Sequence, residues 1–499
     1  MNLLGINVTK TQAMVFFTLY LSYVGVYICR KNYGNLVLAF TTDIPESCQS
    51  SSSCIKTLYV DEYERLSLEE VGRLSTAFQL AAAASKFVTP VFVDTHSPRL
   101  VLSGALLCCA LTNIAMSFFT NNLLALTALW GLNGFVNALA WPALSKAFMA
   151  WFPNPEQRGR LYSFMSTNQS IGAALAPVIV LWGSHLLGTW KAVMLAPGAV
   201  GIVIAALVYL FVKDRTVETK DVNRGGKRGQ AIAVSKFPLD LSSTSTSTMT
   251  SVLWDEVFTN PAIYMLGICH MCTLLVRDGW SDLSIKYLTD KDTWSYTQES
   301  TTKCVWMLHA GGFVGSLVAG WVSDKIYNGK RAPVIGLAMG GCVVPLMFLM
   351  QGSHGFPDAI VGYVPPVCFF LLGCFSFTPH VLLGLMAREL VSPKAQTTSA
   401  SVEKFMANLG GAMAGSPLGY VVQTYGWGGG LQVLSTASVL GFGVMVPLWS
   451  RGAWVPSSSE KKKKVRTEQN LEKANVVQAA GGKKKKSTGR KRSTSRKKK

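Results

Sequence analysis

Charged residues are scarce in this chain. Asp, Glu, Lys and Arg together make up 15% of its 499 residues, whereas soluble globular proteins carry about 25%. Hydrophobic residues make up 49%, and the mean hydropathy is +0.29. These values exclude an ordinary soluble protein and indicate an all-α membrane protein that crosses the bilayer several times.

The sequence also lacks the patterns that accompany catalysis or metal binding. No nucleophile lies in a recognisable arrangement with a general base, and no glycine-rich cofactor loop appears. The chain has six histidines, and their spacing does not resemble that of metal ligands. We therefore expect neither enzymatic activity nor a cofactor nor a metal site.

Long apolar segments, in contrast, are plentiful. A bilayer span needs about 20 apolar residues, and twelve segments meet this requirement, six on each side of a polar break. They are 12–40, 74–94, 99–119, 123–151, 160–184 and 190–212, then 260–288, 304–325, 332–351, 360–390, 397–423 and 430–450. We expect a six-helix half at 1–212, a cytoplasmic linker at 213–259, a second six-helix half at 260–450 and a disordered tail at 451–499.

The net charge of +20 comes mostly from the tail. From Arg451 to Lys499 the sequence has eighteen Lys or Arg residues and three Glu residues, a composition that does not form a core. Basic runs can bind nucleic acid, but this one follows a membrane domain. We therefore expect the tail to contact anionic lipid, with no nucleic-acid partner.

Basic loop residues gather on one side of the predicted membrane domain. The linker has seven Lys or Arg residues, and Arg99 and the loop Lys325–Arg331 fall on the same side. The positive-inside rule then places both termini in the cytoplasm. The C-terminal Ser-Arg-Lys-Lys-Lys loosely resembles a retrieval signal, which favours the endoplasmic reticulum membrane over the plasma membrane. We expect a monomer in the lipid bilayer.

The first loop contains Cys48 and Cys54. These two residues can form a disulfide if the loop faces an oxidising compartment, and the sequence leaves this open. No cleavable signal peptide is evident at the N-terminus.

Three landmarks recur in the same order in both halves, which is typical of transporters built from repeats. The first is an arginine in the opening segment, the second an Asp loop followed by a basic residue, and the third a small-residue run in which Asn precedes Pro by nine positions. They are Arg30 and Arg277; Asp94–Arg99 and Asp324–Arg331; and Asn168–Pro177 and Asn408–Pro417. In the third pair we expect Gly172 and Gly410 to allow close helix packing and nothing more.

The Asp loops are candidates for gating. Asp94 and Asp324 can cap a helix N-terminus and pair with Arg99 and Arg331, respectively. Such a latch would form in one transport state and break in the other. The alternative is a plain loop turn.

Arg30 and Arg277 each lie inside an apolar segment. A charge at bilayer depth costs about 2.5–3.5 kcal/mol, so it indicates a substrate path. The planar guanidinium fits phosphate or carboxylate oxygens. Tyr23, Tyr27 and Arg30 share one helix face, so phenol hydroxyls add donors there. The alternative for Arg30 is snorkelling to the interface, against which the apolar run to Phe40 argues.

The neighbours of the two arginines lead to further expectations. Asp278 follows Arg277 directly, so we expect it on a different face, with Asp282 better placed to orient the guanidinium. Lys31 follows Arg30 directly on the same helix, so we expect its side chain to point away from the face that carries Arg30. Together these residues predict an anion held between the two halves.

Other polar residues lie at depth, and basic ones outnumber acidic ones, which favours an anionic cargo. We expect Glu403 and Lys404 to form a pair at the membrane interface, and His270 and His309 to take part in helix packing. The rest are Lys86, Asn137, Lys146 and Gln169.

The run Tyr23–Tyr33 resembles the organophosphate:phosphate antiporters of the major facilitator superfamily, which include glycerol-3-phosphate, hexose-6-phosphate and endoplasmic-reticulum glucose-6-phosphate transporters. The resemblance covers 11–450 and implies the major facilitator fold, with twelve helices in two pseudo-symmetric halves. Further matching segments are Ser85–Phe87, Trp141–Pro142, Glu156–Gly159, Arg277–Trp280, Gly320–Lys325, Glu389–Leu390 and Pro393–Lys394.

The resemblance implies that Arg30 and Arg277 bind the phosphoryl group from opposite sides, with Tyr27 and Lys86 beside them. Two positions depart from the family pattern. Gln169 replaces a histidine associated with phosphate binding, and His309 stands where some members have a glutamate. The candidate substrate-binding residues are Tyr23, Tyr27, Arg30, Lys86, Asn137, Gln169 and Arg277.

We therefore expect a membrane antiporter that exchanges a phosphorylated sugar or triose, of the glucose-6-phosphate or glycerol-3-phosphate type, for inorganic phosphate by alternating access. Two alternatives remain: a carrier for another organic anion, and a sensor that binds a sugar phosphate without transporting it.

Overall fold

The computed structural model describes residues 2–3, 6–42, 65–152, 161, 164–165, 167–214, 254–392 and 395–450. These residues belong to one compact unit, Met1–Gly452. Cys48 and Cys54, most of the predicted linker and the predicted tail lie outside the described residues, so those predictions stay predictions. So do the boundaries of the four predicted parts.

The described chain is almost entirely helical, as predicted. The first half begins with a hairpin of two short antiparallel strands, β1 (Asn2–Leu3) and β2 (Ile6–Asn7). Its helices are α1 (Lys10–Lys31), α2 (Tyr33–Thr41), α4 (Leu68–Thr95), α5 (Pro98–Met116), α6 (Leu123–Trp151), α8 (Asn168–Leu187) and α9 (Ala192–Phe211). The second half contains α11 (Pro261–Thr289), α12 (Gln298–Lys325), α13 (Ala332–Gly341), α14 (Val343–Met350), α16 (Val364–Glu389), α17 (Gln396–Met413) and α18 (Ser416–Met445). Four short helices are η4 (Trp254–Phe258), η5 (Ser353–Gly355), α15 (Asp358–Val361) and η6 (Val446–Leu448).

The helix lengths agree with the predicted number of spans. In the described part of the chain, nine helical elements are long and apolar enough to cross a membrane. The last of them, Thr398–Leu448, has 51 residues and is divided at Gly426, where φ is 72°, so it supplies two spans. Helices α4 and α11 have 28 and 29 residues but carry more charge. With these two added, the described helices provide the twelve spans.

Local sequence signals explain where several helices begin. Helix α1 starts with a capping box in which Thr9 and Gln12 satisfy each other's backbone N–H groups, and α4 starts with the same arrangement of Ser67 and Glu70. Because of the cap at Ser67, α4 begins six residues before the predicted span. Its first turn is helical but polar, so an apolar-segment criterion does not include it.

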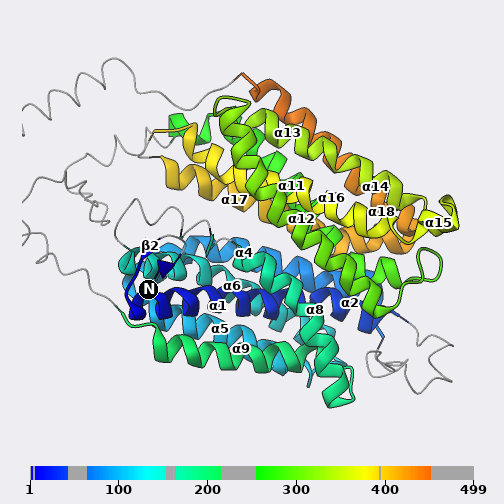
Figure 1. Cartoon of the computed structure of the whole chain (residues 1–499), viewed down its shortest axis with the longest axis horizontal. Helices are drawn as coiled ribbons and strands as arrows, with labels where there is room; N and C mark the ends of the chain where they lie inside the picture. The colour runs from blue at the N-terminus through cyan, green and yellow to red at the C-terminus, as the bar shows by residue number, and fades with distance from the viewer. Residues whose placement is uncertain are drawn as a thin grey trace, which may run out of the picture. The chain divides into compact units, whose positions relative to one another are not determined.

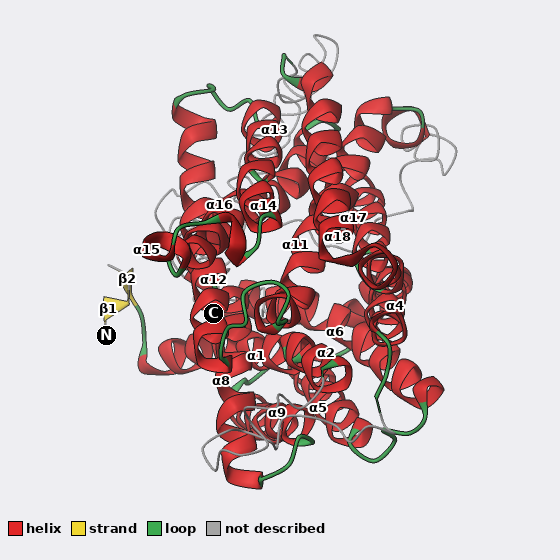
Figure 2. Ribbon diagram, turned by 90° about the vertical axis from the view of Figure 1, so that its right-hand side faces the viewer, coloured by secondary structure: helices red, strands yellow, loops and turns green. Residues whose placement is uncertain are grey.

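The helices pack as two groups, α1 to α9 and α11 to α18 (Figure 1, Figure 2). Between the groups, α4 packs against α17 and α18, α2 against α11, and α8 against α12. The contact between α4 and α18 is tight, since a Cβ on Gly72 would lie 2.8 Å from the Gly415 backbone. The C-terminal end of α1, which carries Arg30, meets α11, which carries Arg277, at this boundary through side-chain ion pairs.

The packing of the small-residue helices repeats in both groups. A Cβ on Gly172 in α8 would lie 2.6 Å from the Val24 carbonyl oxygen of α1, and a Cβ on Gly410 in α17 would lie 1.9 Å from the Met271 carbonyl oxygen of α11. No side chain fits at either position. The prediction that these two glycines allow close packing is confirmed.

Candidate functional site

An interruption between α1 and α2 positions the first arginine. Asn32 separates the two helices, and its amide donates to the Asn113 side chain at 2.8 Å and to the Val193 carbonyl at 2.9 Å. Arg30 and Lys31 consequently lie in the last turn of α1, where the helix dipole favours cations. The Arg30 guanidinium carbon lies 5.6 Å from the centre of the Tyr27 ring.

The second arginine lies in α11 and is held by its sequence neighbour. Nε and Nη2 of Arg277 donate to Oδ1 of Asp278 at 3.1 and 3.0 Å. The expectation that Asp278 lies on a different face and that Asp282 orients Arg277 was wrong. A helical wheel places Cβ atoms, whereas the long arginine side chain bends around the helix to reach the adjacent carboxylate.

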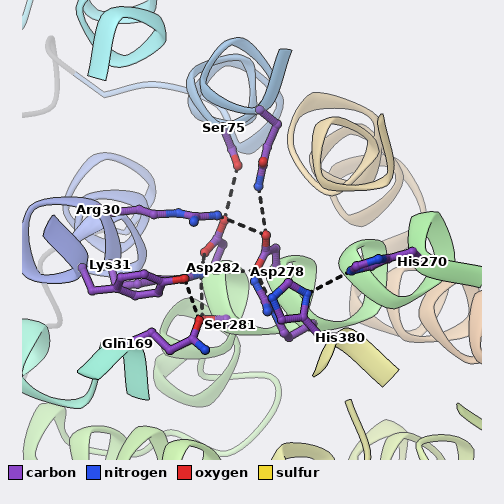
Figure 3. A network of polar contacts seen from close by, with 12 residues as sticks. Arg30, Lys31, Ser75, Gln169, His270, Asp278, Ser281, Asp282 and His380 are labelled. Carbon is purple, nitrogen blue, oxygen red and sulfur yellow. Dashed lines mark hydrogen bonds and ion pairs between the residues drawn. The ribbon is translucent and has the colours of Figure 1, made fainter. Parts of the chain in front are cut away.

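The Asp278 carboxylate also binds residues of the first helix group. Its Oδ2 accepts from Arg30 Nη2 at 3.3 Å and from Gln79 Nε2 at 2.9 Å, and Lys31 Nζ lies 3.7 Å from Oδ1. Figure 3 shows Arg30 and Asp278 reaching toward each other. Arginines from the two groups therefore bind the same carboxylate, whose side chain is 1% exposed.

Lys31 belongs to this network, although the sequence led us to expect that it points elsewhere. Its Nζ lies 2.9 Å from Asp282 Oδ1 and 3.2 Å from Ser281 Oγ (Figure 3). The other oxygen of Asp282 accepts from Ser75 at 3.3 Å. This second ion pair also joins α1 to α11, so the two helices are connected by charge at two adjacent points.

A small cavity borders the network. Its free volume is about 10 Å³, which is room for about one water molecule. Tyr27 donates to Gln169 at 3.0 Å on its wall, and the buried His309 has an Nδ1 without a partner among the described atoms. The lining residues are Tyr27, Lys31, Gln169, Ala173, Arg277, Asp278, Ser281, His309 and Phe377.

The other predicted binding residues surround this centre less closely. The Tyr23 ring lies 5.3 Å from the Tyr27 ring. Lys86, half-buried in α4, is close enough to Arg30 and Lys404 to interact with both electrostatically. Asn137 is buried in α6, where its side-chain Nδ2 has no hydrogen-bond partner among the described atoms.

A second polar cluster lies on the same face of α11, two turns before Arg277. His270 Nδ1 contacts the carboxylate of Glu403, and His270 Nε2 lies 2.9 Å from His380 Nδ1 and 3.4 Å from Lys404 Nζ. Glu403 is 0% exposed. The prediction that Glu403 and Lys404 form an interfacial pair was therefore wrong for Glu403, because α11 supplies a buried partner that the local sequence does not reveal.

Only one of the two predicted latches can be described. Arg331 lies 2.5 Å from Asp324 and 3.4 Å from Glu389, so it connects the ends of α12, α13 and α16. Partial burial alone would lower the pKa of Arg331, but hydrogen bonds to Glu389 and Asp324 outweigh it and raise this pKa. The side chain of Asp94 lies outside the described residues. Its expected partner, Arg99, stacks on Tyr209 at 4.3 Å.

Four polar residues were not predicted from the sequence: Gln79, Ser75 and Ser281 in the network, and His380 in the second cluster. Gln79 and Ser75 lie on successive turns of α4, and both are buried. An amide and a hydroxyl one turn apart in an apolar segment would have been the signal for a polar helix face. His380 has no comparable signal, because its role depends on the approach of α11.

The chain matches a family model described as Major Facilitator Superfamily over residues 12–415. Its relatives include a probable hexose phosphate transport protein of Chlamydia trachomatis, 27% identical over 87% of this chain and 90% of the relative. The membrane sensor protein UhpC of Escherichia coli is 27% identical over 87% and 91%, respectively. A glycerol-3-phosphate transporter of Bacillus subtilis is 25% identical over 89% and 93%.

Two solved structures share the fold. A bacterial homologue of the human lysosomal transporter Spinster has a TM-score of 0.64 and 12% identity, covering 90% of this chain and all of that chain. The nucleoside transporter NupG has a TM-score of 0.62 and 12% identity, covering 89% of this chain and all of that chain. The relatives confirm the resemblance and the expectation of a multi-pass membrane transporter rather than an enzyme. The chain belongs to the Major Facilitator Superfamily.

Proposed function

We propose that this chain is an antiporter that exchanges a phosphorylated sugar or triose, of the glucose-6-phosphate or glycerol-3-phosphate type, for inorganic phosphate. One observation carries the proposal. Arg30 and Arg277, from opposite helix groups, bind the same carboxylate in a buried network. Such a pair presents charged donors from two sides, which suits a phosphoryl group. The names of the relatives point to the same class of cargo.

The charge of the site supports a doubly negative cargo. The Asp278 network and the His270 cluster, taken together with Lys86, which lies between them electrostatically, contain five cationic side chains and three carboxylates. This excess leaves two positive charges without a carboxylate partner in these clusters when the histidines are neutral. A phosphate monoester or inorganic phosphate in its dianionic form balances them. The cations are Arg30, Lys31, Lys86, Arg277 and Lys404, and the carboxylates are Asp278, Asp282 and Glu403.

This balance gives a reason for exchange. Burying uncompensated charge is strongly unfavourable, so a carrier without cargo resists the occluded state through which alternating access passes. A dianion removes that barrier. In the structure Asp278 pairs with both arginines, so the uncompensated charge belongs to these clusters as a whole rather than to the two guanidiniums alone.

The test is exchange in proteoliposomes containing the purified chain. Vesicles loaded with inorganic phosphate should take up labelled glucose-6-phosphate or glycerol-3-phosphate, and vesicles loaded with a simple carboxylate should not. Phosphoenolpyruvate in the same panel tests a cargo with one more charge. Uptake that is equally fast with carboxylate inside would contradict the proposal and favour a carrier for other organic anions.

A second candidate is a sensor that binds a sugar phosphate without transporting it. The 27% identity to the membrane sensor protein UhpC favours this alternative. The basic tail would then be its output. A chain truncated after residue 450 that still exchanges phosphate argues against a sensor, whereas binding without any exchange in the full chain supports one.

Orientation, location and partners complete the proposal. Both termini lie in the cytoplasm, the chain is a monomer in the endoplasmic reticulum membrane, and its tail contacts anionic lipid. The Arg331 latch opens in one transport state. Epitopes at both termini should be accessible to antibody after the plasma membrane alone is permeabilised; a protected terminus would contradict this topology.

A further inference from the structure

Asp278 occupies the position that the proposed function requires for the phosphoryl group. An ionised carboxylate offers about four acceptor positions. Here Arg277 fills two of them, and Arg30 and Gln79 fill the other two. The carboxylate therefore takes up donors from α11, α1 and α4 together, as a phosphoryl group between the same helices would.

The arrangement leaves no room for both anions. Arg277 presents to Asp278 its Nε and Nη2 edge, which is the edge that binds oxyanions through two parallel hydrogen bonds. A phosphate at the same edge would face a like charge in a buried site, which is unfavourable. The adjoining cavity, of about 10 Å³, has room for about one water molecule. Both observations favour a cargo that replaces the carboxylate over one that binds beside it.

We propose that Asp278 is a tethered counter-ion that occupies the phosphoryl position and is displaced by cargo. This inference rests on the proposed function. Lys31 Nζ, 3.7 Å from Oδ1, is the partner to which the displaced carboxylate turns, so that its charge stays compensated. The Asp278 carboxylate competes with the phosphate dianion for the two guanidiniums. This competition lowers the affinity of the site for phosphate and allows the dianion to dissociate.

The test is the affinity of the full chain for inorganic phosphate, measured by calorimetric titration in detergent. Asp278→Asn keeps the size of the side chain and removes its charge. We expect this variant to bind phosphate roughly ten- to a hundredfold more tightly than the wild type, the scale of one charge-assisted hydrogen bond. Asp358→Asn is the matched control, because Asp358 is exposed at the start of α15, outside the cavity lining, and its loss changes the net charge equally. The dissociation constant of Asp358→Asn for inorganic phosphate should equal that of the wild type.

The outcomes separate this inference from the function on which it rests. A wild type that binds and exchanges phosphate while Asp278→Asn binds no more tightly overturns the inference and leaves the function standing. A wild type that neither binds nor exchanges phosphate overturns both. Infrared difference spectra of the wild type provide a test without substitution, since a displaced carboxylate changes its hydrogen bonds. Phosphate should shift a carboxylate band, and an unchanged band contradicts displacement.

Discussion

The ion pair between Lys31 and Asp282 leads to a quantitative prediction. Its atoms are 2.9 Å apart, and both side chains are 9% exposed. Breaking a buried pair by removing one partner costs about 3–5 kcal/mol, whereas replacing both partners with apolar residues is often neutral. Lys31→Met and Asp282→Leu should therefore each destabilise the chain, and the double variant should be more stable than either.

The structure also predicts an order for the two single variants. In Lys31→Met the Asp282 carboxylate keeps, of its contacts with the described residues, Ser75 at 3.3 Å. In Asp282→Leu the Lys31 ammonium keeps Ser281 at 3.2 Å and Asp278 at 3.7 Å. We therefore expect Lys31→Met to have the full cost of about 3–5 kcal/mol and Asp282→Leu a smaller one.

Thermal unfolding in detergent, followed with a thiol-reactive dye, measures these differences. Seven free cysteines are buried in the described part of the chain, so unfolding exposes thiols to the dye. A double-mutant cycle then gives the coupling energy of the pair. If the double variant loses as much stability as the two single variants combined, the two residues do not stabilise one another and the reasoning is refuted.

Further predictions concern helix packing and the second polar cluster. Gly410→Ala should reduce the yield of folded protein, because its Cβ would overlap the Met271 carbonyl oxygen of α11. Gly104→Ala is the control, because its Cβ would meet no side chain and no other helix within 4 Å, and its yield should match that of the wild type. Equal yields of the two variants on size-exclusion chromatography would contradict this prediction. Glu403→Gln should reduce the free energy of unfolding by about 1–3 kcal/mol, because it removes the charged partner of buried His270. The unfolding temperature should fall accordingly, and an unchanged midpoint would contradict this.

The sequence identified the helices and the two arginines because both signals are local. Apolar runs of span length have few alternatives to a helix in lipid, and a charge within such a run stands out. The interruption at Asn32 could not be predicted, since Asn32 is neither Pro nor Gly and the nearby Gly34 lies inside α2. It depends on Asn113 and Val193, which lie in other helices.

The contacts of the site were less predictable than its position. The role of Asp278 follows from the reach of Arg30 across the boundary between the helix groups, and sequence spacing contains no information about that boundary. Glu403 was assigned to the interface because it is charged and near the start of its predicted span. Its buried position depends on His270 from α11, a partner that becomes visible only once the helices are packed.

The central claim is that Arg30 and Arg277 together bind one phosphoryl group between the two helix groups. The most direct test is phosphate exchange by Arg30→Lys and Arg277→Lys in phosphate-loaded proteoliposomes, with expression and unfolding temperature as controls. Lysine keeps the charge but loses the planar donor pair, so we predict that each variant folds and that each loses exchange. Wild-type exchange in either variant would contradict the account.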